Sequence, residues 1–207
     1  MKLVLATQNK DKIKEITLLL HDLPIEILTY KDFDFFPNII EDKNSLKGNA
    51  EKKARKIWEE FKESRVSVLA DDTGLFVDAL NGKPGVYSSR FAGENVSYKH
   101  NRQKLLNMLK NVPKGKRTAT FRTVIVLIMK NGNKIVAQGQ CKGYIGFEEK
   151  GDKGFGYDSI FYLNGYNKSF AQLTRKEKNK ISHRGIALRK IRAVLKEISN
   201  NNNNNIN

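Results

Sequence analysis

The stretch TATFRTVIVLIM occupies residues 118–129, and KIVAQGQCKGYI follows it at residues 134–145. Both stretches are long and rich in residues that favour extended backbone. Asn131-Gly132-Asn133 lies between them and is typical of a hairpin turn. We therefore predict two long strands joined by a hairpin.

Predicted strands and helices alternate on both sides of this hairpin. Lys2–Thr7 is a short apolar run, and Asn9 then caps a helix whose apolar residues recur at helical spacing. The other predicted elements are helices over Leu46–Phe61, Ser97–Leu109 and Ser182–Ile198, a strand over Val66–Ala70 and a glycine-rich loop over Gly151–Gly156. In Leu46–Phe61 the apolar residues share one face, and the remaining face is assigned to Lys52, Lys53 and Lys56. This alternation predicts a mixed α/β protein.

Composition limits the class of protein. The chain has 207 residues, of which 39% are hydrophobic and 29% charged, so wholesale disorder and a collagen-like repeat are excluded. We expect a single domain over residues 1–199 and a disordered asparagine-rich tail over residues 200–207. Cys141 is the single cysteine, which fits a reducing compartment. No apolar run approaches the ~20 residues of a membrane helix. These features predict a cytoplasmic protein without a membrane partner.

The chain carries a net charge of +16, which favours polyanionic partners such as nucleotides or nucleic acid. A nucleic-acid-binding module is one alternative, and the basic segment Arg175–Lys180 supports it. The sequence contains no helix-turn-helix signature, RNP-type motif or zinc-ligand pattern. We therefore expect no stable nucleic-acid partner.

Two pairs of acidic residues are the first candidates for chemistry. Asp71 and Asp72 follow the predicted strand Val66–Ala70, and Glu41-Asp42 precedes the helix Leu46–Phe61. Mg²⁺ needs only one or two protein carboxylates, because water and phosphate oxygens complete its coordination. The alternative is that Asp71-Asp72-Thr73-Gly74 is a simple turn, since Asp and Gly are common turn residues.

Three further segments have both a functional and a structural interpretation. Thr7–Lys12 begins a helix, where backbone N–H groups attract an anion, but Asn9 also fits a plain N-cap. Gly154–Asp158 could present aromatic rings to a base, or form a bulge with core aromatics. Glu177–Arg184 could contact substrate, or be a solvated basic helix start.

Taken in order, four segments closely resemble the inosine triphosphate pyrophosphatase family, also called the Ham1-like family. They are TQNKDK (7–12), ADDTGLFVDALNGKPGVYSSRFAG (70–93), GFGYDSIF (154–161) and SFAQLTRKEKNKISHRGIAL (169–188). The resemblance implies an α/β fold with a mixed, elongated central sheet and flanking helices, in which two lobes enclose a nucleotide cleft. It also implies a homodimer that hydrolyses ITP, dITP and XTP to the monophosphate and pyrophosphate with Mg²⁺, or Mn²⁺ as a substitute, and so clears them from the nucleotide pool.

The resemblance also implies residue roles. Glu41 and Asp72 match metal ligands, and Asp72 matches the proton acceptor. The residues that match substrate contacts are Thr7, Gln8, Asn9, Lys12, Thr73, Phe155, Gly156, Tyr157, Asp158, Lys178, His183 and Arg184. Lys53 is a further candidate for binding the triphosphate, because of its position in the predicted helix Leu46–Phe61. Three residues depart from the commoner pattern, namely Gln8, Ser159 and Gln172. An NTP pyrophosphatase of another family is the closest enzyme alternative, but it should lack the combined FGYD and SHR segments.

Base selection follows from donors and acceptors. Hypoxanthine and xanthine present a 6-oxo acceptor and an N1–H donor, and adenine presents the reverse. A donor from His183 or Arg184 facing the 6-oxo group would therefore reject adenine, because buried polar groups would be left unpaired. Phe155 or Tyr157 is expected to stack on the base. Guanine has the same 6-oxo and N1–H edge, so it must be rejected at position 2, where its amine differs.

Overall fold

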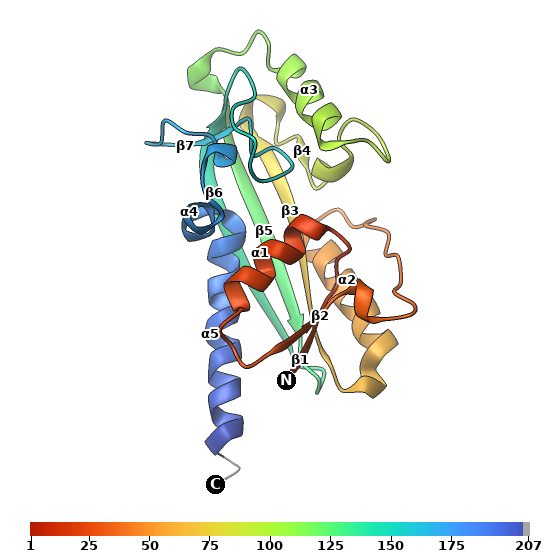
Figure 1. Ribbon diagram of the computed structural model, residues 1–207. Helices are drawn as coiled ribbons and strands as arrows, with labels where there is room; N and C mark the ends of the chain where they lie inside the picture. The colour runs from red at the N-terminus through yellow and green to blue at the C-terminus, as the bar shows by residue number, and fades with distance from the viewer. Residues whose placement is uncertain (205–207) are drawn as a thin grey trace. The chain divides into compact units, whose positions relative to one another are not determined.

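A computed structural model describes residues 1–204 of the chain, with side chains up to Ser199. Within this range the chain forms one sheet flanked by helices (Figure 1). The strands are β1 (Lys2–Leu5), β2 (Glu26–Leu28), β3 (Ser67–Val77), β4 (Pro84–Gly85), β5 (Thr118–Ile128), β6 (Lys134–Ile145) and β7 (Phe161–Leu163). The helices are α1 (Lys10–Leu20), α2 (Leu46–Phe61), α3 (Tyr98–Met108), α4 (Arg175–Ile181) and α5 (His183–Asn204). No helix in the described range is long and apolar enough to cross a membrane.

The sheet is mixed and has the strand order β2-β1-β3-β5-β6-β7, with β4 paired to β3. β1 pairs in parallel with both β2 and β3. β4 is antiparallel to β3, and β7 is antiparallel to β6. The parallel strands β1 and β3 are almost completely buried, as expected for strands covered on both faces.

The chain forms two compact units. The first comprises residues 1–72, 124–138 and 185 onward, and the second comprises residues 73–123 and 139–184. The strand β3 passes from the first unit to the second between Asp72 and Thr73. The single-domain assignment over residues 1–199 stays a prediction.

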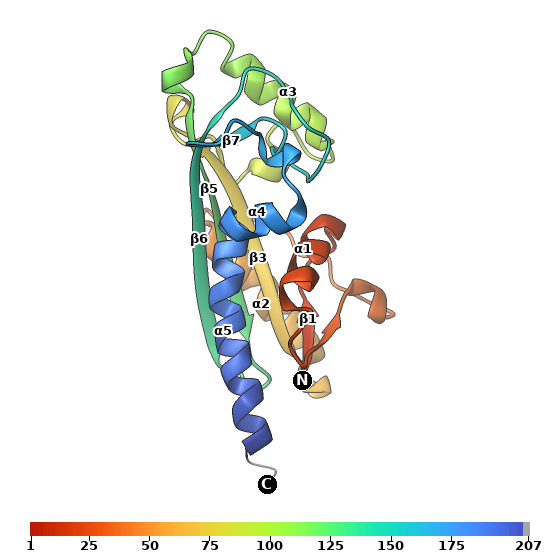
Figure 2. The ribbon, with the colours of Figure 1, turned by 60° about the vertical axis from the view of Figure 1, so that its left-hand side comes forward.

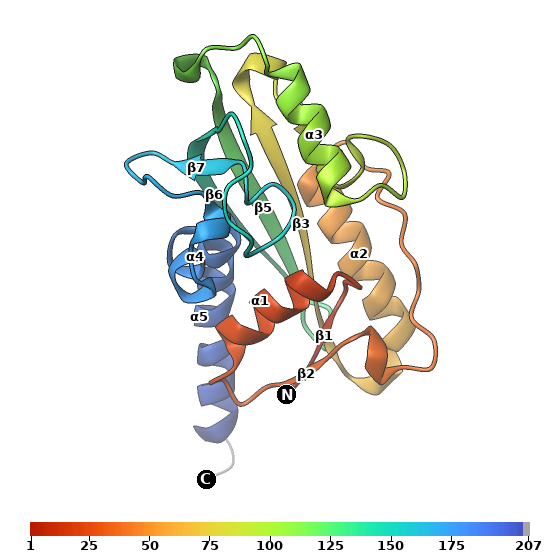
Figure 3. The same ribbon diagram turned by 45° about the horizontal axis from the view of Figure 1, so that its top comes forward.

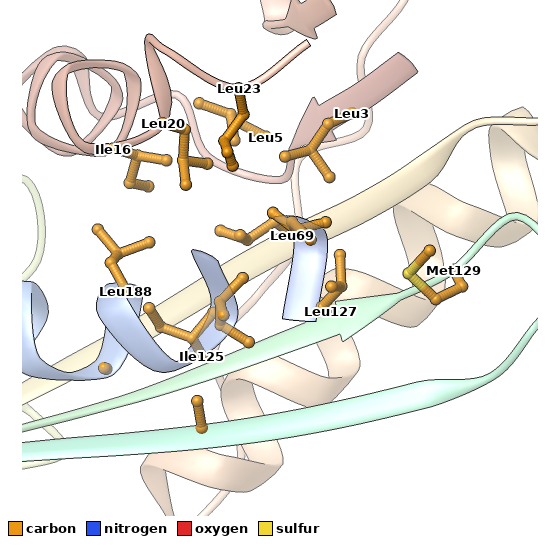
Figure 4. Close-up of a cluster of buried hydrophobic side chains, with 14 residues drawn as sticks. Leu3, Leu5, Ile16, Leu20, Leu23, Leu69, Ile125, Leu127, Met129 and Leu188 are labelled. Carbon is orange, nitrogen blue, oxygen red and sulfur yellow. The ribbon is translucent and has the colours of Figure 1, made fainter. Parts of the chain in front are cut away.

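The core of the first unit lies between α1, α5 and one face of the sheet, and α2 covers the other face (Figure 2). Figure 4 shows Ile16 of α1 and Leu188 of α5 converging on strand residues such as Leu5 and Leu69. All four side chains are inaccessible to solvent. Burying a side chain of this size contributes about 1.5–3 kcal/mol, so this cluster fixes the position of α1 and of the segment that precedes it.

Helix α2 has the predicted bounds, with Ser45 accepting a hydrogen bond from Gly48 N across 3.0 Å as its N-cap. Its buried residues are Leu46, Asn49, Ala50, Lys53, Ala54 and Ile57. This spacing of three and four residues defines one helix face. The assignment of Lys53 to the polar face is therefore wrong, because Lys53 and Asn49 lie on the buried face.

The core of the second unit is rich in aromatic side chains. The rings of Phe121 and Phe161 make an edge contact at 4.7 Å between centroids, and Phe170 lies 4.9 Å from Phe161. Leu105 and Leu109, at the end of α3, pack against the same cluster. Figure 3 shows α3 on the β3 side of the part of the sheet that belongs to this unit.

Arg117 is a buried cation of the second unit, with only 1% of its surface exposed. Its guanidinium donates to the carbonyl oxygens of Ile145 and Gly146 across 2.8 and 2.7 Å. It also donates to those of Leu109 and Val112 across 2.7 and 3.3 Å. One side chain therefore joins the end of α3 to the end of β6.

The structure corrects the predicted end of the central strand. Asp71-Asp72-Thr73-Gly74 is not a turn, because β3 continues through these residues to Val77. Gly74 allows this continuation, since a Cβ there would lie 2.5 Å from the carbonyl oxygen of Gly85 in the adjacent β4. The two aspartates therefore project from inside a sheet rather than from a loop.

The last helix also differs from its predicted end. Helix α5 extends to Asn204, six residues beyond the predicted end at Ile198. The asparagine run was predicted to be disordered over residues 200–207, and residues 205–207 of that tail lie outside the described residues.

Candidate active site

The predicted acidic residues come together in the first unit. Nζ of Lys53 lies 2.6 Å from Oε1 of Glu41 and 3.5 Å from Oδ1 of Asp72. The same ammonium donates to the carbonyl oxygen of Asp71 across 2.7 Å. We call Glu41, Asp71 and Asp72 the carboxylate cluster. Lys53 is its central cation, because one ammonium group contacts all three residues.

Lys12 is a second cation at the carboxylate cluster. Its Nζ lies 3.1 Å from Oδ1 of Asp71 and 3.4 Å from the carbonyl oxygen of that residue. Lys12 stands in the first turn of α1, where Asn9 is the N-cap. The predicted helix start therefore places Lys12 against Asp71, although the two residues are 59 positions apart in sequence.

The charges of this group perturb one another. Burial is the largest influence on the pKa of Glu41 and raises it, but attraction to Lys53 and the hydrogen bond from it lower the net pKa below its usual value. Burial likewise disfavours charge on Lys53, yet Asp72 and Glu41 raise the net pKa of its ammonium group. For Asp72, burial prevails and raises the pKa despite the nearby lysines. Asp72 is therefore a stronger base than an exposed aspartate.

The carboxylate cluster fits a hard cation. Glu41 and Asp72 come from separate elements yet share one ammonium group, so both carboxylates can face one positive charge. Within residues 1–204 no group of three or more His, Cys, Asp and Glu side chains forms a complete metal cage. Mg²⁺ takes only one or two protein carboxylates, because water and phosphate oxygens are its other ligands, and Glu41 and Asp72 could supply these two.

The segment before α1 shows how the N-cap is made. Oδ1 of Asn9 accepts hydrogen bonds from the backbone N–H groups of Asp11 and Lys12 across 3.0 and 3.1 Å. Oγ1 of Thr7 accepts from Asn9 N across 3.2 Å. The N-cap interpretation of Asn9 is confirmed. Gln8 is exposed, so its side chain lies at the surface of the first unit.

In the second unit, Thr73 joins one other predicted site residue, Arg184, to Thr123, which the sequence did not suggest. Nη2 of Arg184 lies 3.1 Å from Oγ1 of Thr73, which in turn lies 2.6 Å from Oγ1 of Thr123. Thr123 is buried in β5, and Arg184 has only 2% of its surface exposed. The Thr73 hydroxyl therefore contacts the Arg184 guanidinium directly, and the Thr123 hydroxyl holds that of Thr73 in place.

The predicted aromatic loop is held by Asp158. Oδ2 of Asp158 accepts from Phe155 N across 2.8 Å and lies 2.6 Å from Nζ of Lys178. Both charged side chains are 5% exposed, so this is a buried ion pair. Gly154 has a φ of +75°, and a Cβ at this position would lie 2.1 Å from Asp158 Oδ2. The loop therefore requires glycine there.

The two aromatic residues of this loop have different environments. Phe155 is half-buried, and its ring centroid lies 5.0 Å from Nζ of Lys178 and 5.4 Å from Cζ of Arg184. Tyr157 is buried in the core of the second unit and donates its hydroxyl to the carbonyl oxygen of Ser88 across 2.9 Å. Phe155 is thus the ring available for stacking, and the core-aromatic interpretation holds for Tyr157.

The segment Glu177–Arg184 is not a solvated helix start. Helix α4 is capped by Thr174, and Lys178 on it is 4% exposed. His183 is 3% exposed, and its ring stacks on Phe121 with centroids 4.5 Å apart and planes inclined by 16°. The solvated alternative is therefore wrong for Lys178, His183 and Arg184, and each has a fixed environment.

The three residues that depart from the commoner pattern have ordinary environments in the structure. Gln172 accepts a hydrogen bond from Ser169 N across 2.9 Å and completes a capping box. Oγ of Ser159 donates to Glu149 across 3.1 Å. Gln8 is exposed. Each of the three side chains is compatible with its surroundings.

The sequence did not suggest Asn49 or Thr123. Asn49 is completely buried on α2, and its Nδ2 donates to Oδ2 of Asp72 across 3.2 Å. A signal was present for Asn49, because a polar residue on the apolar face of a helix needs a buried partner. Thr123 has no comparable signal, since threonine is common in strands.

The predicted site residues thus form two groups, one in each unit. Thr7, Gln8, Asn9, Lys12, Glu41, Lys53 and Asp72 lie in the first unit, and Thr73, Phe155, Gly156, Tyr157, Asp158, Lys178, His183 and Arg184 lie in the second. Both groups combine buried carboxylates with buried or half-buried cations. The model of the Ham1 family matches residues 3–194.

The chain belongs to the Ham1 family. A relative in Desulforamulus reducens, named dITP/XTP pyrophosphatase, is 47% identical over 198 residues, which cover 96% of this chain and 97% of the relative. A relative of the same name in Clostridium perfringens is 44% identical over 200 residues, covering 95% and 98% of the two chains. The family predicted from the four motifs is thus confirmed.

Solved Ham1 structures have the same fold. The HAM1 protein of Coxiella burnetii has a TM-score of 0.83 at 40% identity and covers 95% of this chain and 99% of its own. The Ham1 protein of Staphylococcus aureus has a TM-score of 0.80 at 36% identity, with 94% and 98% coverage. The predicted α/β fold with a mixed sheet and flanking helices is confirmed.

Proposed function

We propose that this Ham1-family protein hydrolyses the non-canonical purine nucleoside triphosphates dITP, XTP and ITP to the monophosphate and pyrophosphate. Relatives named dITP/XTP pyrophosphatase match it over nearly their full length. The observation that supports the proposal most directly is the contact of one ammonium, that of Lys53, with both Glu41 and Asp72. These are the two carboxylates that the resemblance to the family matches to metal ligands.

In this proposal, Glu41 and Asp72 hold Mg²⁺, and Mn²⁺ can replace it. The bound ion neutralises charge on the phosphate oxygens and lowers the pKa of water. Lys12 and Lys53 supply positive charge for the triphosphate. When the nucleotide binds, its phosphate oxygens replace part of the contacts that these lysines now make with the carboxylate cluster. Asp72 accepts the proton of the attacking water on its carboxylate, which is the role that the resemblance to the family assigns to it.

The residues of the second unit bind the nucleoside. Phe155 stacks on the base, because its ring is half-buried whereas that of Tyr157 is committed to the core. Arg184 and His183 are donors for the 6-oxo group of hypoxanthine or xanthine. The hydroxyl groups of Thr73 and Thr123 support Arg184 in this role. Asp158 and Lys178 hold the loop that carries Phe155.

Pyrophosphate release from a panel of triphosphates tests the function. We expect release from ITP, dITP and XTP in the presence of Mg²⁺, much slower release from ATP and GTP, and none when the metal is chelated. Inorganic phosphate should not appear as the first product, because cleavage falls between the α- and β-phosphates. Equal kcat/KM for ATP and ITP would contradict the assignment of the 6-oxo contact.

Assembly and location are further parts of the proposal. We infer a cytoplasmic homodimer, which the resemblance to the family implies. Light scattering on the protein as it elutes from a size-exclusion column should give a mass of twice the 23.6 kDa of one chain. A mass equal to one chain at assay concentration would contradict the dimer and leave the proposed reaction untouched.

A further inference from the structure

Asn49 makes two hydrogen bonds from a position without solvent access. Its Oδ1 accepts from the backbone N–H of Lys43 across 2.9 Å, and its Nδ2 donates to Oδ2 of Asp72 across 3.2 Å. The backbone N–H of Lys43 can only donate, so the amide oxygen must face it and the NH₂ group must face Asp72. The orientation of the amide is therefore fixed by its own partners.

The two oxygens of Asp72 are thus bound from the same helix. Oδ2 faces Nδ2 of Asn49, and Oδ1 lies 3.5 Å from Nζ of Lys53. Asn49 and Lys53 are four residues apart on α2, so both side chains leave the same helix face. A neutral donor and a cation together determine the rotation of the carboxylate about its Cβ–Cγ bond.

Asn49 also reaches the segment that carries Glu41. Lys43 is two residues beyond Glu41, and its main chain is tied to Asn49 rather than to any strand. The segment from 37 to 45 has no regular secondary structure of its own. Its position near Glu41 therefore depends on contacts such as this one and the Lys53–Glu41 pair.

We infer that Asn49 is a positioning residue, which holds the Asp72 carboxylate in one orientation and couples it to the segment bearing Glu41. This inference rests on the proposed function of Asp72. Asn49 acts on turnover through Asp72 and contacts neither the phosphates nor the base. Its loss should therefore lower kcat much more than it changes KM for the nucleotide.

Two substitutions separate the two hydrogen bonds. Asn49→Leu keeps the approximate shape of the side chain and removes both. Asn49→Asp keeps an acceptor for Lys43 N and replaces the donor to Asp72 by a like charge. We expect kcat for ITP to fall about 10- to 100-fold in both variants, the effect of losing a hydrogen bond to a charged group, while KM changes less than about threefold.

Asn101 provides the matched control. It is also a buried helical asparagine, at 1% exposure, that accepts from a loop N–H, that of Ala92, across 2.7 Å. Its Nδ2 donates across 2.9 Å to the carbonyl oxygen of Ser89 instead of a carboxylate. Asn101→Leu should lower the Tm about as much as Asn49→Leu but leave kcat within about twofold of the wild-type value.

Amide hydrogen exchange gives a readout that is independent of turnover. The exchange rate of the Lys43 amide should rise by about tenfold or more in Asn49→Leu and stay near the wild-type rate in Asn49→Asp. These rates are measured without nucleotide or metal. They report directly whether the amide of Asn49 anchors the segment after Glu41.

The outcomes are distinguishable. If the wild-type protein releases pyrophosphate from ITP but Asn49→Asp keeps its kcat, the inferred role of Asn49 is wrong and the proposed function stands. If Asn101→Leu lowers kcat as strongly as Asn49→Leu, the effect is general destabilisation and the inference fails. If the wild-type protein releases no pyrophosphate, the proposed function itself fails. An unchanged exchange rate of the Lys43 amide in Asn49→Leu would separately reject the anchoring role of Asn49.

Discussion

Lys53 donates a hydrogen bond to Glu41 across 2.6 Å, and both side chains are largely withdrawn from solvent. Removing one partner of a buried pair costs about 3–5 kcal/mol, because the other charge is left without compensation. We expect Lys53→Met to destabilise the protein by an amount near the lower end of this range, since Glu41 keeps partial access to water. Urea unfolding measures the change. Lys56→Met, on the exposed side of α2, serves as control and should be nearly neutral.

Asp72→Asn tests the proposed proton acceptor. The substitution preserves the shape of the side chain but removes its charge and basicity, so we expect kcat to fall by about 100-fold or more. The matched control is Asp42→Asn, because Asp42 is exposed and pairs with Lys52 across 2.8 Å near the same cluster. Initial rates of pyrophosphate release give both values. Near-normal turnover of Asp72→Asn would reject its assignment.

Thr123→Val tests the support of Arg184. Valine has the shape of threonine without the hydroxyl that lies 2.6 Å from Thr73. We expect KM for ITP to rise about 3- to 10-fold, because the Thr73 hydroxyl that contacts the Arg184 guanidinium loses its own partner. Thr123→Ser retains the hydroxyl and should restore KM to near its wild-type value. An equal KM in the valine and serine variants would show that the hydroxyl has no role.

Lys178→Met tests the buried pair that holds the aromatic loop. Without Lys178 the carboxylate of Asp158 is buried without its cation, so we expect a loss of about 3–5 kcal/mol in the free energy of unfolding. The double variant Lys178→Met/Asp158→Asn should recover part of this loss, because no charge is then left unpaired. Guanidinium unfolding of the two variants provides the comparison. A double variant less stable than the single one would contradict this explanation.

Cys141 should be unreactive in the folded protein. Burial raises the pKa of its thiol to about 12, from an ordinary value of 9.0, so the thiolate is scarce at pH 8. We expect no reaction with a disulfide reagent at pH 8 until the protein is unfolded. Between pH 9 and 12 the unfolded chain loses this proton and the folded chain keeps it, so the contribution of Cys141 to stability falls as pH rises. The free energy of unfolding of Cys141→Ala should therefore decrease less between pH 9 and 12 than that of the wild-type protein.

Local sequence signals were sufficient where local interactions decide the structure. Helix α2 has the predicted bounds, and Asn9 is the predicted N-cap of α1. Hydrophobic spacing and capping are properties of neighbouring residues, so one sequence contains them. The strand β6 likewise has the predicted bounds, Lys134–Ile145.

The errors arose where distant partners decide the structure. Asp71 and Asp72 are common in turns, but here Lys12, Lys53 and Asn49 stabilise their charges inside a strand. Spacing along the chain cannot reveal such partners. The same reason explains the misplaced Lys53, since a lysine on a buried helix face is favourable only when carboxylates lie opposite it.

The buried guanidinium of Arg117 has a wider consequence for tolerance to mutation. Four main-chain acceptors on two separate stretches would lose their donor together if this arginine were replaced. Lysine is no substitute, because a single ammonium cannot imitate a planar fork with five N–H groups. The ends of α3 and β6 therefore both depend on the side chain at position 117. Even a conservative substitution there should unfold the protein, although Arg117 lies outside the proposed nucleotide contacts.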